Sequence, residues 1–191
     1  MSGQLDRLFA EYSLLDSSER GGDEGVRRSL RYFRVERCLI DDPHALDRVS
    51  DRTTAWVRMV RTVHGFTVHH GRLPKSYGRS RQVREKAEES RLAEWLRYQR
   101  RPGVQARLSD YQVRRLECVE GYSWDPAGER WDDHLFTYLA FVKAHERKPR
   151  YRSDDREEQR LAGWAAKQRH LLKRGLLSHA KAMEFQRAIS L

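Results

Sequence analysis

The chain has 191 residues, enough for one large domain or two to three small ones, and 38% hydrophobic residues with five tryptophans indicate a folded protein. No stretch approaches the roughly 18 apolar residues that cross a bilayer, and the N-terminus lacks the cationic start and apolar run of a signal peptide, so we expect a cytosolic protein without a membrane segment. The net charge of +10 is uneven: residues 1–51 carry eight arginines and eleven acidic residues, whereas residues 52–191 carry the other thirty cationic residues and seventeen acidic ones. The second part, at about +13, favours a polyanionic partner over a merely solvated basic surface.

Residues 1–51 predict two helices that have no counterpart later in the chain. Apolar residues at helical spacing between Leu5 and Leu15 predict the first helix. Residues 26–40 predict the second, which Asp41-Asp42-Pro43 ends. We expect this mildly acidic segment to self-associate, to contact another protein or to cover a later part of the chain.

The remainder of the chain contains one unit built twice. The segment LAEWLRYQRR at 92–101 returns as LAGWAAKQRH at 161–170, an offset of 69 positions. Upstream the offset is 75, where Trp56 corresponds to Trp131. The second copy is therefore six residues shorter in the loop that precedes the repeated segment, as expected when a surface loop is trimmed and buried positions are kept.

Each copy predicts three helices. In the first copy they run from about Thr54 to His70, through Leu92 to Gln99, and from a capping box at Ser109 to before Gly121. No strand pattern of useful length occurs. The sequence thus predicts an all-α fold with an N-terminal helical segment, residues 1–51, and two tandem three-helix bundle modules, residues 52–127 and 128–191.

The first copy carries five landmarks in a fixed order, and the relevant residues are Trp56, His70-Gly71, Tyr77, Leu92-Ala93-x-Trp95-x-x-x-Gln99-Arg100 and Gly121-Tyr122-Ser123-Trp124. They resemble the helicase-associated domain, a small three-helix module found in tandem arrays, often in actinobacteria and often beside superfamily-2 helicases. The resemblance covers about residues 52–191. It implies nucleic-acid binding, and an actinobacterial or phage origin.

The departures from that family's outline are few. Ala93 and Ala162 replace its usual glycine, Glu146 stands where the second copy should have glycine, and the second copy lacks the closing Gly-aromatic-x-Trp. The chain has no P-loop and no room for helicase motor domains. The resemblance therefore implies a nucleic-acid-binding module without the motor domains of a helicase.

Both copies place dense cations after their first helix. Residues 72–107 hold eleven Lys/Arg and four Glu, and residues 143–174 hold eleven Lys/Arg and five acidic residues. Such cations neutralise phosphates, and a loop tyrosine stacks on a base or bonds a phosphate. The predicted nucleic-acid-binding residues are Arg72, Lys75, Tyr77, Arg79, Arg81, Arg97, Arg100, Arg101, Arg147, Lys148, Arg150, Tyr151, Arg152, Lys167 and Arg169.

Two recurring glutamines leave alternatives open. Gln99 and Gln168 have the chemistry to read an adenine edge, but each lies near the helix face of a core tryptophan and is equally suited to satisfy a buried polar group. The arginines that follow them, Arg100 and Arg169, share this ambiguity.

Catalysis and metal binding find little support in the sequence. The run Asp154-Asp155-Arg156-Glu157-Glu158 is better explained as the start of a helix than as paired nuclease carboxylates. No His/Cys grouping has zinc-ligand spacing, and the two cysteines are far apart, so we expect no metal, no cofactor and no disulfide.

The sequence therefore predicts a non-enzymatic protein that binds duplex DNA, with a regulatory, nucleoid-associated or phage-associated role in the cytoplasm. A protein-interaction adaptor with an acidic partner and an RNA-binding protein are the alternatives. We expect no membrane and no small-molecule substrate as partner.

Overall fold

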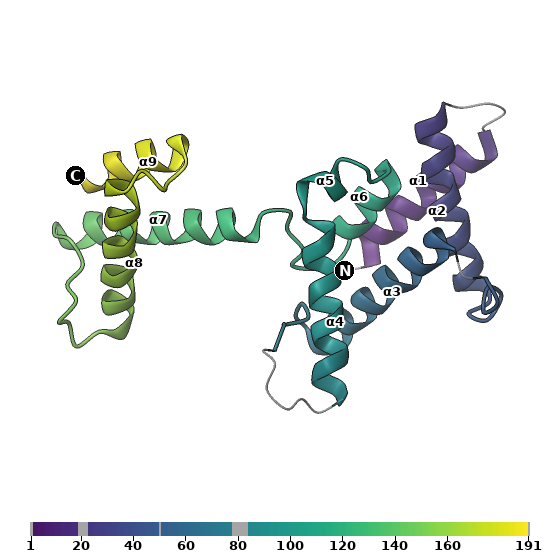
Figure 1. The fold of residues 1–191 in the computed structure, drawn as a ribbon, viewed down its shortest axis with the longest axis horizontal. Coiled ribbons are helices and arrows are strands. Elements are labelled where there is room, and N and C mark those ends of the chain that lie inside the picture. Colours follow the sequence, from purple (N-terminus) through teal and green to yellow (C-terminus); the bar gives the residue numbers. More distant parts are fainter. Residues whose placement is uncertain (1, 19–22, 50, 78–83, 191) are drawn as a thin grey trace. The chain divides into compact units, whose positions relative to one another are not determined.

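The computed structural model describes residues 2–18, 23–49, 51–77 and 84–190, and these are all-α (Figure 1). No strand occurs within those ranges, which confirms the predicted fold class. The helices of the described ranges are α1 (Ser2–Ser18), α2 (Glu24–Asp41), α3 (Arg52–His70), α4 (Arg84–Gln99), α5 (Pro102–Gln105), α6 (Asp110–Glu117), α7 (Pro126–His145), α8 (Arg156–Lys173) and α9 (His179–Ile189).

The chain divides into two compact units, residues 1–124 and 125–191. The division lies close to the expected module boundary at 127/128, just before α7 begins at Pro126. Residues 1–51 do not form a unit of their own, because they belong to the first unit together with α3 to α6.

Several helices begin or end at the capping residues that the sequence predicts. Asp51 caps α3 by accepting from the Thr53 and Thr54 backbone N–H groups at 2.7 and 2.9 Å. Ser109 forms the expected capping box with Gln112 at the start of α6. Gly71 follows α3 with φ +63°, the left-handed conformation that favours glycine.

In the first unit, α2 packs against α3 and α6, and α1 packs against α2 and α6 (Figure 1). Leu8 and Tyr12 of α1, Leu30 and Phe33 of α2, and Tyr111 of α6 form one buried cluster. A second cluster joins α3, α4 and α6 around Trp56, Val60, Leu96 and Leu116, with Leu39 of α2 added to it. Of the three roles open to residues 1–51, covering a later part of the chain is the one realised within this unit.

A buried ion pair also connects α2 to α6. The Glu36 carboxylate and the Arg115 guanidinium are 1% and 2% exposed, and they approach to 2.9 Å. The Tyr111 hydroxyl donates to Glu36 at 2.9 Å. His64 Nδ1 lies 3.3 Å from Arg115 Nη1, and burial together with the Arg115 charge lowers the pKa of His64. His64 is therefore the neutral acceptor at this edge of the network.

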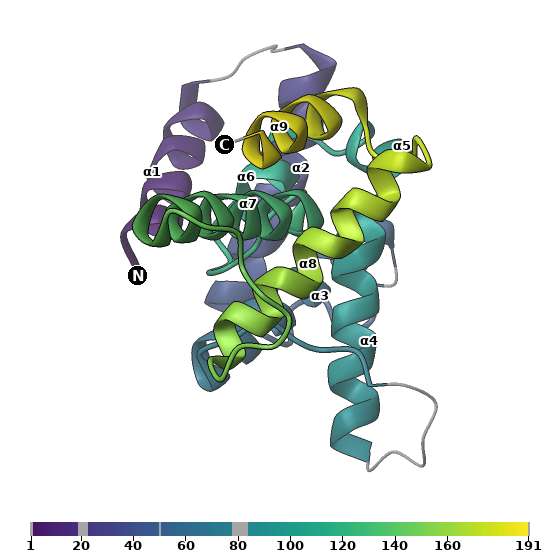
Figure 2. The ribbon, with the colours of Figure 1, turned by 90° about the vertical axis from the view of Figure 1, so that its left-hand side faces the viewer.

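The second unit is built from α7, α8 and α9, which share one hydrophobic core. In Figures 1 and 2, α8 crosses α7 and α9 lies near the C-terminal end of α8. The core residues are Trp131 and Tyr138 from α7, Leu161 and Ala165 from α8, and Phe185 and Ala188 from α9. Glu146 ends α7 with φ +51°, so it takes the left-handed position that Gly71 takes after α3.

Candidate nucleic-acid interface

In the first unit a buried glutamate holds the basic loop that follows α3. Glu89, in α4, accepts from Arg72 Nη1 at 2.5 Å, from the Lys75 backbone N–H at 2.8 Å and from the Tyr77 hydroxyl at 3.1 Å. The Arg72 guanidinium, followed by the backbone donor, holds the pKa of the Glu89 carboxyl at about 2. The ionised Glu89 carboxylate thus joins three positions of the loop to α4.

The second unit repeats this arrangement at the offsets seen in the sequence. Glu158, in α8, accepts from Arg147 Nη1 at 2.5 Å, from the Arg150 backbone N–H at 2.8 Å and from the Ser153 hydroxyl at 2.8 Å. Arg147 is the main reason why the pKa of Glu158 is lowered to about 2. The first two donors, the arginine and the backbone N–H, correspond at the offset of 75, whereas the hydroxyl donor comes from Tyr77 in one unit and from the non-corresponding Ser153 in the other.

Arg72 and Arg147, both predicted as binding residues, serve this structural arrangement. Besides their glutamates, their guanidinium groups lie 5.3 and 5.1 Å from the ring centres of Phe66 and Phe141. A guanidinium held by a carboxylate and an aromatic ring has little left to offer a phosphate. We therefore assign both arginines to the support of the loop.

The two ambiguous glutamines support the fold. The Trp56 indole N–H donates to Gln99 Oε1 at 3.1 Å, and the Trp131 indole N–H donates to Gln168 Oε1 at 3.1 Å. Both amides are buried, so neither reaches a base edge from this position. The indole N–H is a buried donor that needs a partner, which explains why the pair recurs in both units.

The other predicted residues of the first unit have varied surroundings. Lys75 extends an exposed side chain, whereas Tyr77 is half-buried against Glu89. Arg97 is exposed and bonds Glu94 at 2.9 Å, and Arg101 lies over the ring of Tyr98. Arg79 and Arg81 lie outside the described residues.

Arg100 is partly buried. Its Nε donates to the Ser123 carbonyl at 2.6 Å, and its guanidinium lies 4.6 Å from the centre of the Tyr122 ring. It therefore ties the end of α4 to the segment after α6. Its counterpart in the second unit, Arg169, is exposed.

Most of the predicted cations in the second unit face solvent. Arg150, Arg152, Lys167 and Arg169 have exposed side chains. Lys148 is exposed too, but its Nζ donates to the Ile189 carbonyl at 2.7 Å, near the C-terminal end of α9 where a cation is favoured. Tyr151 is 69% exposed.

The sequence did not predict the role of the two organising glutamates: Glu89 is there only one of the acidic residues among the cations, and Glu158 is part of the acidic run that opens a helix. A signal was present: Glu89 and Glu158 occupy the same place in the repeat, three residues before Leu92 and Leu161. The expectation that the acidic run at 154–158 opens a helix agrees with the structure, where Asp155 caps α8 by accepting from the Glu157 backbone N–H at 2.9 Å.

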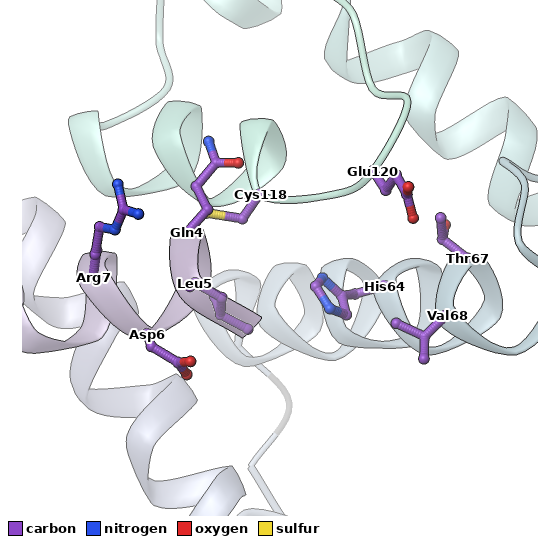
Figure 3. Close-up of a pocket in the computed structure, with 10 residues that line it drawn as sticks. Gln4, Leu5, Asp6, Arg7, His64, Thr67, Val68, Cys118 and Glu120 are labelled. Carbon is purple, nitrogen blue, oxygen red and sulfur yellow. The ribbon is translucent and has the colours of Figure 1, made fainter. Parts of the chain in front are cut away.

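The first unit also contains a pocket of about 700 Å³, formed by the first turns of α1, by α3 and by residues that follow α6 (Figure 3). Acidic and basic side chains are mixed in its lining, where Asp6 and Glu120 accompany Arg7 and His64. This mixture does not make a cationic surface, so the candidate interface remains on the loops and on α8.

Neither a metal site nor a membrane span stands out in the described residues. They contain no group of three or more His, Cys, Asp or Glu side chains placed to hold an ion. None of their helices has the length and apolar content required to cross a membrane.

Comparisons of the chain with protein-family models, with curated proteins and with solved structures give no match. The resemblance to the helicase-associated domain therefore remains a hypothesis that rests on the residues quoted for it.

Proposed function

We propose that the protein binds duplex DNA without catalysing a reaction, in a regulatory, nucleoid-associated or phage-associated role. The observation that carries the proposal is the repeated loop. In both units a buried glutamate fixes the backbone at Lys75 or Arg150 while the cationic side chain at that position stays exposed. A cation on a fixed backbone loses less freedom when it meets a phosphate than one on a loose chain does.

The remaining exposed cations support the same partner. Arg152, Lys167 and Arg169 lie in the same unit as Arg150, and Arg97 and Arg101 accompany Lys75 in the other. Electrostatic binding to phosphates is independent of sequence and needs only such exposed cations. Two units on one chain raise the overall affinity when both engage the same duplex.

A salt titration with random-sequence duplex DNA tests the proposal. If about four to seven phosphates are neutralised, the slope of log affinity against log salt is about −4 to −6. Binding should be followed by fluorescence anisotropy of a labelled duplex. A flat salt response, or no binding at low salt, would refute nucleic-acid binding and favour an adaptor with an acidic protein partner. If duplex RNA competes more strongly than duplex DNA, the partner is RNA and not DNA.

A further inference from the structure

The solvent-facing side of α8 carries a row of mostly cationic residues, of which only Lys167 is among the binding residues named so far. Its buried positions, among them Leu161, Ala165 and Gln168, set the inward face. The outward face carries, at spacings of three or four residues, Arg156, Arg160, Gly163, Lys167, His170 and Arg174. Residues at this spacing lie above one another on a helix. At 1.5 Å per residue the row extends over about 27 Å, which is long enough to follow several phosphates of one strand.

The row, defined as these six positions, has no carboxylate of its own. Arg160 pairs with Glu157 beside it, and that pair is exposed at the surface. Within the described part of the second unit, Arg156, Lys167 and Arg174 have no ion-pair partner. Three cations of the row are therefore available to a phosphate at no cost in broken ion pairs.

Tyr151 lies at the centre of the row. A Cβ atom at Gly163 would stand 3.5 Å from the Tyr151 hydroxyl oxygen and 3.9 Å from Cζ, so the ring rests on the helix where a side chain is missing. Most of the ring nevertheless faces solvent, and its neighbours Arg150 and Arg152 are exposed as well. The result is an aromatic surface held between cations.

The first unit has the opposite chemistry at the same place. Glu94 corresponds to Gly163 and Ser76 corresponds to Tyr151. The Ser76 hydroxyl donates to Glu94 Oε1 at 3.1 Å, and Arg97 bonds the same carboxylate at 2.9 Å. A carboxylate in the middle of this face repels phosphates, and a serine stands where the second unit has Tyr151.

The geometry points to the outward face of α8 and Tyr151 as a site for DNA with an unpaired segment, an inference that rests on the proposed function. The cations of the row follow the phosphates of one strand, and one unpaired base stacks on the Tyr151 ring. A base inside a duplex is already stacked on both sides, whereas an unpaired base has a face to offer. The protein therefore prefers a duplex with a single-stranded overhang to the same duplex with blunt ends.

The full-length protein is tested by fluorescence anisotropy with these two labelled DNAs at one salt concentration. Wild type should bind the overhang DNA more tightly by roughly 5- to 150-fold, the value of one stacked base. Tyr151→Ala should abolish the preference, and Tyr151→Phe should keep it. Tyr98→Ala, which removes an exposed tyrosine from α4, is the matched control and should keep it as well.

A second pair of variants tests the row separately from the ring. Gly163→Glu and Gly163→Gln compete equally with Tyr151 for space, so the difference between them isolates the charge. Both replace glycine inside a helix and should preserve α8, which circular dichroism verifies. Gly163→Glu should bind both DNAs more weakly than Gly163→Gln, with a salt slope lower by about one.

Equal affinity of wild type for the two DNAs, or an undiminished preference in Tyr151→Ala, would overturn the inference while leaving duplex binding intact. Equal affinities of Gly163→Glu and Gly163→Gln would show that the row does not take part in DNA binding. Failure of wild type to bind either DNA would instead overturn the proposed function.

Discussion

Replacing Glu36 by Gln should strongly destabilise the first unit. Glu36 accepts from Arg115 Nε at 3.0 Å, from Arg115 Nη2 at 2.9 Å and from the Tyr111 hydroxyl at 2.9 Å. The amide keeps the shape but removes the negative charge, which leaves the Arg115 guanidinium buried without a counter-ion. Removing one partner of a buried pair costs about 3–5 kcal/mol of the free energy of unfolding. For a unit of this size the melting temperature should fall by roughly 10–20 °C.

Differential scanning calorimetry and urea unfolding followed by tryptophan fluorescence measure this loss. The transition of the second unit, which contains neither residue, provides an internal reference. Arg34→Ala is the matched control, because Arg34 joins α2 to Asp16 of α1 with its side chain 60% exposed. An exposed pair contributes at most about 1 kcal/mol, so this variant should melt close to wild type.

The double variant Glu36→Gln, Arg115→Met distinguishes an uncompensated charge from lost packing. With both charges gone, much of the stability should return, since no unpaired charge is then left buried. If Glu36→Gln unfolds at the wild-type urea concentration, then α2 does not depend on this pair for its packing on α6.

Three further predictions concern the repeated features. Gln168→Leu should lower the free energy of unfolding of the second unit by about 1–3 kcal/mol, because the Trp131 indole N–H loses its buried acceptor; unchanged chemical denaturation would contradict this hydrogen bond. Lys75→Ala and Arg150→Ala should each lower the DNA salt slope by about one with an unchanged melting temperature, and a wild-type slope in both would place the phosphates elsewhere. Because the folded pKa of Glu89 is lowered to about 2 from an ordinary 4.5, its contribution to stability is complete above about pH 4.5 and is lost as the pH falls toward 2. Stability measured from pH 6 to pH 2 should therefore decline less steeply in Glu89→Gln than in wild type, and parallel curves would exclude this carboxylate as a source of acid sensitivity.

The sequence by itself determined most of the helical elements, although it predicted neither α5 nor the start of α4 at Arg84. The apolar spacing of α3, the aspartate cap at Asp51 and the capping box of Ser109 with Gln112 all act between residues a few positions apart. Such interactions can be read from a short window, because their partners are fixed by helix geometry alone. The recurrence of Trp56 and Gln99 at Trp131 and Gln168 was also visible, but not the reason for it.

Tertiary structure alone decided which polar side chains support the fold and which remain for a partner. Arg72 and Arg150 look alike in a basic loop, yet the first is held by Glu89 and the second is exposed. Glu36 and Arg115 stand 79 positions apart and meet only because α2 packs on α6. The contacts of a long charged side chain depend on how helices that are distant in the sequence cross each other. A local sequence pattern does not show that crossing. For this reason the polyanionic partner stays a prediction from the chain's charge, whereas the proposal for α8 and Tyr151 depends on the packing of Tyr151 against Gly163 in the second unit.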